Sequence, residues 1–352
     1  MRILFIKLGA IGDVTQAAAA VLHFRARHPG AEITWVVGKA IAPLLNRFGV
    51  ADHVHALDES EILSGSLPSR LRALARHALA LRGLSPRFDL VVTAYGDWRY
   101  RLLTGLVRAS RFRHYDRRAI RRPSPLQHRN RVFEYIRLLE DEGERHADIS
   151  ALMQALGERF LAHRSADLPP MATVPKHVVL APGGARNLLR SDALRRWPLH
   201  HYVKLAEALV EAGVPITLAG GPADDWVCPA FAHLPVRNLV GQTDLTGMVE
   251  LLSQATVVVT HDSGPLHLAT ITRAGLVALF GPTPANACIP LGRPKTIVHE
   301  PGNRVCCSPC YDGRDYADCQ QALCMEASTV EAVTQSVLAL LSTPAAAATE
   351  AS

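Results

Sequence analysis

The sequence predicts an α/β protein of two domains, each built on a parallel sheet. Short apolar runs alternate with helical patterns along the chain, and strands separated by helices form parallel sheets with right-handed crossovers. Several of these runs end in glycine-containing turns, which lie together at the carboxyl edge of such a sheet. The length of 352 residues corresponds to about two domains of ordinary size.

The first half contains three predicted strands and one long helix. The apolar run at residues 3–6 is too short for a secretion signal and is followed by Lys7 and glycines, so it indicates a strand. An alanine-rich helix is predicted from residue 14 to about residue 27, and further strands are predicted at 32–37 and 89–93.

The same alternation restarts after a proline-rich segment at 165–176, which we expect to be an interdomain linker. Four predicted strands then run into glycine turns; they cover residues 178–180, 216–219, 256–260 and 277–280. Helices are expected at 199–211 and 330–341. The predicted domains are therefore 1–168 and 176–342, and the low-complexity tail at 343–352 is expected to be disordered. Two such domains facing each other would place a cleft between them.

The composition excludes several classes of protein. Apolar residues make up 48% of the chain and charged residues 20%, which excludes a disordered polyelectrolyte, a fibre and a small disulfide scaffold. No apolar run approaches the roughly 18–20 residues that span a bilayer, so an integral membrane protein is not expected. We expect the protein to be in the cytoplasm.

The net charge of +6 is concentrated in an arginine-rich stretch at residues 99–131, in which Asp116 is the only acid. Its arginines stand at positions 99, 101, 108, 111, 113, 117, 118, 121, 122, 129 and 131. Such a stretch either forms a solvated surface or attracts phosphorylated substrates and anionic lipid headgroups. Nucleic acid is not expected, because no RNA-binding or helix-turn-helix pattern accompanies the stretch.

Asp13 is the first candidate for chemistry. It follows Gly9-Ala10-Ile11-Gly12 after the first predicted strand, so its carboxylate should face the cleft. Residues 13–16 also have the spacing of a helix capping box, in which Asp13 would only accept a backbone N–H. The loop lacks the third glycine of a dinucleotide-binding fingerprint, and the local sequence leaves the cleft role and the capping role open.

A second candidate site follows the third predicted strand of the second half. Pro265 suits the first turn of a helix, so Ser263 and the amides around Gly264 are expected to form an anion pocket for a diphosphate. His267 lies one turn further and can donate to the same anion. The alternative is that Asp262 caps the helix and that His267 is a half-buried core residue.

A group of arginines follows the glycine turn at 182–184. Arg190, Arg195 and Arg196 precede the predicted helix start at Trp197-Pro198. A guanidinium pairs with two phosphate oxygens at once, so these side chains are expected near the same diphosphate. An exposed basic loop is the alternative.

Four segments, in this order, resemble those of glycosyltransferase family 9, the ADP-heptose:lipopolysaccharide heptosyltransferases and their relatives. They are IKLGAIGD at 6–13, RRWP at 195–198, DSGPLHLA at 262–269 and ALFGPT at 278–283. The resemblance covers nearly the whole chain and is weakest at 99–131. It implies a GT-B fold, in which two Rossmann-like domains bind the acceptor and the nucleotide sugar and transfer is inverting and metal-independent.

The resemblance also implies roles for individual residues. Asp13 matches the family's catalytic carboxylate, which deprotonates the acceptor hydroxyl. The donor-binding positions match Asp262, Ser263, Gly264 and His267; Thr243 falls where the family contacts the nucleoside, and Asp224 or Asp225 is expected at the ribose. Arg195 stands where the family usually has lysine, so a cation is kept but its contact geometry differs.

The sequence therefore predicts transfer of heptose from ADP-heptose to an anionic acceptor such as the lipopolysaccharide inner core, with no cofactor for catalysis. Arg99 and Arg101, in the arginine-rich stretch, are expected to hold acceptor phosphates or carboxylates, and the stretch is expected to contact the inner-membrane surface.

Five of the seven cysteines lie between Cys306 and Cys324. The positions Cys307, Cys310, Cys319 and Cys324 give the spacing C-x2-C-x8-C-x4-C, whose first pair is typical of a metal site. Some members of the family that this chain resembles carry a comparable cysteine cluster that binds iron or zinc. We expect a structural iron or zinc site here, with free surface thiols as the alternative.

Other functions remain open. The cysteine cluster favours a relative that glycosylates a protein such as an autotransporter. A nucleotide-binding oxidoreductase is disfavoured, because neither half has G-x-G-x-x-G followed by an acid about 20 residues later. A binding protein without catalysis is disfavoured by the presence of Asp13 and Asp262.

Overall fold

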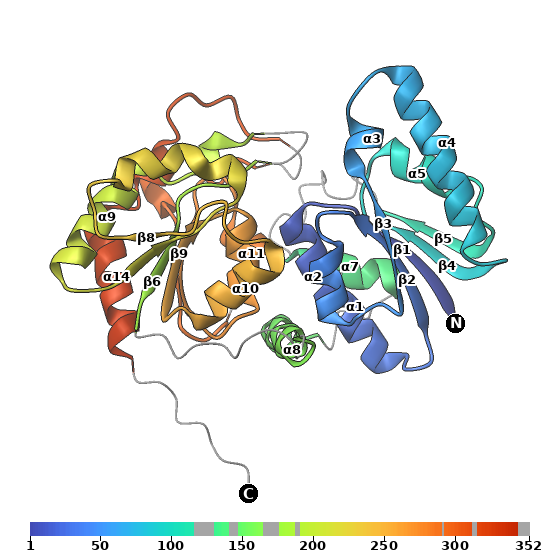
Figure 1. Cartoon of the computed structure of the whole chain (residues 1–352), viewed down its shortest axis with the longest axis horizontal. Helices are drawn as coiled ribbons and strands as arrows, with labels where there is room; N and C mark the ends of the chain where they lie inside the picture. Colours follow the sequence, from blue (N-terminus) through green and yellow to red (C-terminus); the bar gives the residue numbers. More distant parts are fainter. Residues whose placement is uncertain are drawn as a thin grey trace, which may run out of the picture.

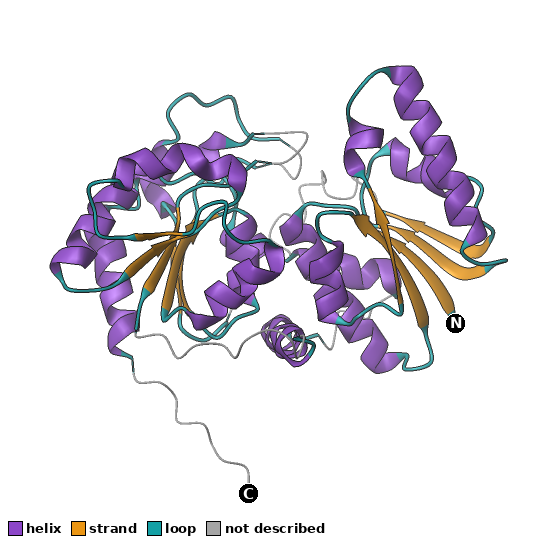
Figure 2. Cartoon of the chain, viewed as in Figure 1, coloured by secondary structure: helices purple, strands orange, loops and turns teal. Residues whose placement is uncertain are grey.

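The computed structural model describes residues 1–115, 130–140, 147–164, 176–186, 191–290, 292–311 and 315–343. Most of the predicted linker, most of the predicted tail and the arginines at 117–129 lie outside these residues. The described residues form two α/β halves that lie side by side, each with a sheet between helices (Figures 1 and 2).

The sheet of the first half has five parallel strands in the order β3-β2-β1-β4-β5. They are β1 (Arg2–Ile6), β2 (Glu32–Gly38), β3 (His53–Leu57), β4 (Phe88–Thr93) and β5 (Ala109–His114). The central strand β1 is buried on both faces, because Ile3 and Phe5 belong to one hydrophobic core and Leu4 and Ile6 to another. This burial explains why its sequence is a continuous apolar run. The edge strands β3 and β5 were not predicted, because most of their side chains are partly or fully exposed and largely polar.

Helices cover both faces of this sheet. One face is covered by α3 (Glu59–Leu63), α4 (Leu67–Gly83) and α5 (Trp98–Thr104). The other is covered by α1 (Ile11–Arg27), α2 (Ala42–Phe48), α7 (Arg131–Leu139) and α8 (Ile149–Ala162). Helix α1 begins three residues before the predicted start, which places Asp13 inside its first turn.

The sheet of the second half has six parallel strands in the order β11-β10-β9-β6-β7-β8. They are β6 (Val178–Ala181), β7 (Ile216–Leu218), β8 (Arg237–Asn238), β9 (Val257–His261), β10 (Gly275–Leu279) and β11 (Thr296–His299). Numbered within this half, the order is that of a dinucleotide-binding sheet, in which ligands bind where the strand order reverses. That point lies between β6 and β9, and the corresponding point in the first half lies between β1 and β4.

The helices of the second half also lie on both faces of its sheet. They are the 3-10 helices η3 (Ala193–Arg195), η4 (Pro222–Phe231) and η5 (Gly302–Arg304) and the α-helices α9 (Leu199–Glu211), α10 (Leu245–Gln254), α11 (Gly264–Thr270), α12 (Ala285–Cys288), α13 (Leu323–Glu326) and α14 (Val330–Ser342). Helices α9 and α14 cover the outer face, whereas α10 and α11 face the first half (Figure 1).

One hydrophobic core runs across the junction of the two halves. It contains residues of α1, α2, α7 and α8 together with residues of α10 and α11. Helix α8 lies between the halves in Figure 1, and a Cβ added at Gly157 in this helix would overlap the carbonyl of Ile271. The close packing of α8 therefore requires a glycine at this position. Within the described ranges, the helices are too short or too polar to cross a bilayer.

Candidate active site

A cavity of about 1040 Å³ lies between the two halves, at the carboxyl edges of their sheets. Residues that follow β1, β2, β3 and β4 line it from one side, and residues that follow β6 and β9 line it from the other. Of the predicted site residues, Asp13, Arg195, Asp262, Ser263, Gly264 and His267 line this cavity.

Asp13 pairs with a buried lysine. Its Oδ2 lies 2.8 Å from the Nζ of Lys7, whose side chain is 1% exposed, while the Asp13 side chain is 32% exposed. The residue that caps α1 is Ala10, and no side chain caps this helix. The capping interpretation of Asp13 is therefore wrong, because its carboxylate binds an ammonium group at the cavity wall.

The charges around Asp13 favour its ionised form. Burial raises the pKa of Asp13, but the charges of Lys7, Arg131 and His267 together have the larger, opposite effect. The net result is a pKa of about 2. Burial lowers the pKa of Lys7, and the Asp13 carboxylate opposes this effect. The pair thus presents a carboxylate at neutral pH with one lysine hydrogen bond already made.

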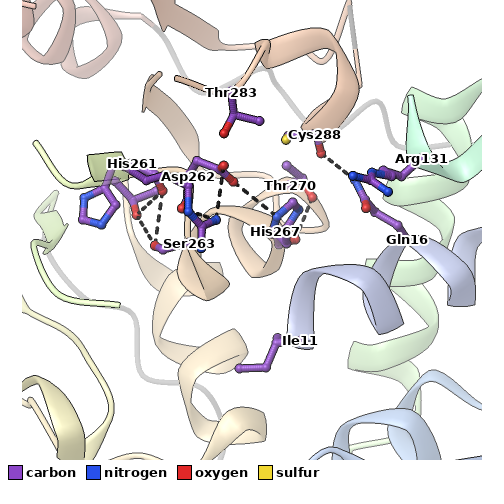
Figure 3. Close-up of polar contacts among 12 residues, drawn as sticks. Ile11, Gln16, Arg131, His261, Asp262, Ser263, His267, Thr270, Thr283 and Cys288 are labelled. Atoms are coloured by element: carbon purple, nitrogen blue, oxygen red, sulfur yellow. Dashed lines mark hydrogen bonds and ion pairs between the residues drawn. The ribbon is translucent and has the colours of Figure 1, made fainter. Parts of the chain in front are cut away.

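The start of α1 lies directly against the second half. A Cβ added at Gly12 would overlap the imidazole of His267, so this glycine allows the turn that carries Asp13 to approach α11. Gln16, one turn further along α1, donates from Nε2 to the carbonyl of Cys288 at 2.7 Å, as Figure 3 shows. Asp13 and Asp262 consequently lie on opposite walls of one cavity.

Arg131 and three tyrosines form a wall that the sequence did not single out. Arg131 begins α7 and donates to the hydroxyl of Tyr115 at 3.0 Å and to that of Tyr311 at 3.3 Å. Burial and the charge of Asp13 raise the pKa of Tyr135, which lines the same wall. Arg131 belongs to the arginine-rich stretch, but only the fold distinguishes it from its neighbours, because its partners are 16 and 180 residues away in the chain.

Asp262 is the centre of a polar cluster on the opposite wall. Arg195 donates from Nη1 to the Asp262 carbonyl at 3.0 Å and to its Oδ2 at 3.2 Å, and from Nη2 to Asp192 at 3.2 Å. His267 Nε2 lies 3.8 Å from Asp262 Oδ1, and Figure 3 shows these two side chains with Thr283 beside them. Burial raises the pKa of Asp262, but its interactions with Arg195, His267 and Thr283 together have the larger effect, so the pKa lies below its usual value.

Ser263 and Gly264 connect this cluster to α11. Ser263 precedes the helix, but its hydroxyl donates to the carbonyl of His261 at 3.2 Å and caps no amide. Burial lowers the pKa of His267 and the charges of Asp262 and Asp13 oppose this effect. Among the described residues, the permanent positive charge on this wall therefore comes from Arg195 and from Arg186, which also lines the cavity; the predicted Arg190 lies outside the described residues.

Two predicted donor-binding residues do not line the cavity. The Asp224 carboxylate accepts from the amide of Gly184 at 2.7 Å and from that of Gly221 at 2.8 Å. It thereby joins the turns after β6 and β7. Thr243 precedes α10, and its hydroxyl is buried without a hydrogen-bond partner among the described residues.

The two predicted acceptor-binding arginines also lie outside the cavity lining. Arg99 forms a two-pronged pair with Asp97, from Nε at 2.9 Å and from Nη2 at 2.7 Å. Arg101 is exposed on α5. Arg99 is therefore already paired with Asp97, which precedes the same helix turn.

The structure does not support the predicted metal site of Cys307, Cys310, Cys319 and Cys324. Across the described ranges, which omit 312–314, no three histidine, cysteine or acidic side chains are grouped to hold a metal ion. Cys307 is exposed and Cys324 is buried. Burial, together with the nearby Cys310, Cys319 and Cys307, raises the pKa of Cys324 to about 11.

Two parallel-sheet halves that share a cavity at their carboxyl edges define a protein of the GT-B fold. The family model of glycosyltransferase family 9 (heptosyltransferase) matches residues 100–319, which is more than half of the chain. The chain therefore belongs to glycosyltransferase family 9. This membership leaves the oxidoreductase alternative without support.

Relatives agree with this assignment. Lipooligosaccharide heptosyltransferase 2 of Haemophilus influenzae is 39% identical over 111 residues, which are 30% of this chain and about a third (32%) of that protein. The lipopolysaccharide core heptosyltransferase OpsX of the same organism is 24% identical over 285 residues, which are 78% of this chain and 77% of that protein.

Solved structures show the same fold at low identity. Escherichia coli heptosyltransferase WaaC with ADP superimposes with a TM-score of 0.69 at 19% identity, covering 97% of this chain and 100% of that one. The iron-containing dodecameric glycosyltransferase TibC of E. coli superimposes with a TM-score of 0.58 at 14% identity, covering 96% of this chain and 75% of that one.

Proposed function

We propose that this protein transfers a heptose from ADP-heptose to a sugar of the lipopolysaccharide inner core, with inversion and without a catalytic metal ion. The observation that carries the proposal is the cavity between the halves. An ionised carboxylate, Asp13, lies on one wall and a half-buried cationic group, Arg195, on the other. The family of the chain and the heptosyltransferase relatives support heptose as the transferred sugar.

The charges of the cavity suit this reaction. As the bond between the anomeric carbon and the diphosphate breaks, negative charge develops on the leaving phosphate, and Arg195 and Arg186 stabilise it. Asp13 accepts the proton of the acceptor hydroxyl. At the same time, the oxygen of that hydroxyl forms a bond to the anomeric carbon, on the face opposite the diphosphate. A doubly charged diphosphate near Asp13 raises its pKa from about 2, which makes the carboxylate a stronger base when the donor is bound.

The nucleoside of the donor is proposed to lie near α10. Solved structures of the same fold were obtained with ADP or an ADP-heptose analogue, which supports adenine as the base. Thr243 carries a buried hydroxyl with no partner among the described residues, and we propose that it contacts the nucleoside. Asp224 holds the adjoining glycine turns, so its part in ribose binding would be to position Gly184 and Gly221.

A saccharide acceptor is favoured over a protein acceptor. The two curated relatives described above are named as a lipooligosaccharide and a lipopolysaccharide core heptosyltransferase.

We also propose that the protein works at the cytoplasmic face of the inner membrane. Large apolar side chains are exposed on and beyond α5: Trp98 (51%), Leu102 (47%) and Phe112 (43%). Exposed arginines such as Arg101 and Arg111 accompany them, and this combination suits an anionic lipid surface. Vesicles of anionic phospholipid should sediment the protein more than neutral vesicles do, and Trp98→Ser should reduce the difference.

Substitution of Asp13 tests the proposed chemistry. Asp13→Ala should lower transfer by about 10²–10⁴-fold, because the general base is lost, while the rise in melting temperature caused by ADP persists. Transfer is measured by mass spectrometry of an inner-core oligosaccharide incubated with ADP-heptose. Asp89→Ala, at an exposed position of β4 outside the cavity, is the matched control. Full turnover by Asp13→Ala would refute the role of this carboxylate.

A further inference from the structure

Glu59 is a cavity residue that the chemistry above does not use. It begins α3, directly after β3, and lines the wall that carries Asp13. A Cβ added at Gly9 would lie 2.8 Å from Glu59 Oε1, and a Cβ added at Gly38 would overlap the same oxygen. The carboxylate therefore lies over two glycines, in a space that any other residue at these positions would fill.

One oxygen of this carboxylate is unsatisfied. Glu59 Oε1 is buried and has no hydrogen-bond partner among the described residues. Burial raises the pKa of Glu59, while the charge of Lys7 lowers it and that of Asp58 raises it. Leaving a buried carboxylate oxygen without a donor is costly, and Glu59 also lines the cavity, so this carboxylate would gain from a ligand that brings a hydrogen-bond donor to it there.

The charged groups around Glu59 indicate which kind of ligand group can donate to it. Lys7 interacts with both Asp13 and Glu59, but its ammonium group already bonds to Asp13. Asp58 adds a second carboxylate next to Glu59, and Lys39 is the remaining cation among the lining residues after β1, β2, β3 and β4. A phosphate or carboxylate placed here would face two carboxylates, whereas a hydroxyl would donate to one of them.

We propose that Glu59 is a specificity residue that accepts a hydrogen bond from a hydroxyl of the acceptor ring, next to the hydroxyl that Asp13 deprotonates. The ring that receives the sugar is then an uncharged, unphosphorylated sugar. The anionic groups of an inner-core acceptor must lie farther from Asp13. This inference rests on the proposed function and specifies the substrate class of the same site.

Two acceptors and three variants test it. The probes are inner-core oligosaccharides that end in the same heptose, either unmodified or with a phosphate on that heptose. The wild type should use the unmodified probe with at least a tenfold higher kcat/KM. Glu59→Gln keeps one carbonyl oxygen but loses the charge. This variant should raise the KM for the unmodified probe about threefold and reduce the ratio of the kcat/KM values for the two probes. Glu59→Ala should raise that KM about tenfold, with kcat and ADP affinity within twofold of wild type.

Glu61→Gln is the matched control. Glu61 lies on the same helix, is exposed, and pairs with Arg76 and His77 outside the cavity, so its removal should leave both kinetic constants unchanged. Melting temperatures confirm that each variant is folded. Equal use of the two probes by the wild type, or an unchanged acceptor KM in Glu59→Ala, would overturn the inference.

Binding separates this inference from the proposed function. Saturation-transfer NMR measures the unmodified probe on the ADP-bound protein without turnover. If the wild type binds the probe and Glu59→Ala does not, yet no heptose is transferred, the proposed reaction fails and the role of Glu59 stands. If the wild type transfers heptose and both proteins bind the probe equally, the proposed reaction stands and the role of Glu59 fails.

Discussion

The two walls of the cavity carry the same local feature with different consequences. In each half, an aspartate follows a central strand and lies close to the start of a helix: Asp13 after β1 and Asp262 after β9. The Asp13 side chain is 32% exposed and forms an ion pair with Lys7. The Asp262 side chain is 6% exposed and is held by Arg195 through both its carboxylate and its carbonyl.

This difference separates a reacting group from a positioning group. Asp13 keeps an accessible carboxylate, so it can accept a proton from a substrate. Asp262 is enclosed, and its charge is used to orient Arg195 and His267 toward the cavity. In the proposed reaction, two similar sequence signals therefore give a base on one wall and a group that holds cations on the other, because the neighbours supplied by the fold differ.

Removal of the Arg195 cation should give the largest effect on the second wall. Arg195→Met removes the charge that faces the diphosphate, so the Kd for ADP should rise about 10–100-fold, which corresponds to ~1.4–3 kcal/mol. Calorimetric titration with ADP measures this change. Arg237→Met, at an exposed position of β8 outside the cavity, should bind ADP as the wild type does. If ADP affinity is unchanged in Arg195→Met, the second wall does not hold the diphosphate.

Replacement of the same arginine by lysine should give a smaller effect. Arg195→Lys keeps the positive charge but cannot contact Asp262 and Asp192 together as the guanidinium does. The Kd for ADP should rise about fivefold, or ~1 kcal/mol. The same titration detects it, and a loss as large as that of Arg195→Met would mean that geometry rather than charge dominates.

A change in pH dependence should be the smallest effect and concerns the first wall. Lys7 lowers the pKa of Asp13, so Lys7→Met should raise that pKa by about 3 pH units, from about 2 to about 5. An acid must be deprotonated to act as a base, so activity is lost as the pH falls through this pKa. At pH 5, kcat/KM relative to pH 8 should therefore fall about twofold in the variant and stay level in the wild type.

Profiles of kcat/KM from pH 4.5 to 9 measure this difference. Lys39→Met removes another cavity cation that is not among the groups acting on Asp13, so it should not introduce the acid limb. A Lys7→Met profile that remains level to pH 4.5 would show that Lys7 does not control the ionisation of Asp13.

Much of the fold could be predicted because the buried strands have local signatures. The runs that became β1, β2, β4, β6, β7, β9 and β10 are apolar and end in turns. The strands at the edges, such as β3 and β8, were missed because partly exposed strands keep polar residues. The GT-B assignment was confirmed by the solved structures.

The roles of the site residues stay predictions, and the structure adds protein partners for two of these residues. Asp224 and Arg99 were expected to contact substrates, but each is occupied by protein partners, which are the amides of Gly184 and Gly221 for Asp224 and the carboxylate of Asp97 for Arg99. A residue type in a sequence indicates what a side chain can bind. It does not indicate which groups of the same chain already bind it.

The sequence alone placed the two candidate aspartates in the fold. An apolar strand, a glycine turn and an aspartate are neighbours along the chain, so local spacing places Asp13 and Asp262 at the carboxyl edges of two parallel sheets. Only the tertiary structure shows the surroundings of Lys7, Glu59 and Arg131. Burial, unsatisfied oxygens and pKa values depend on atoms that are distant in the chain, and these atoms meet only when the two halves pack together.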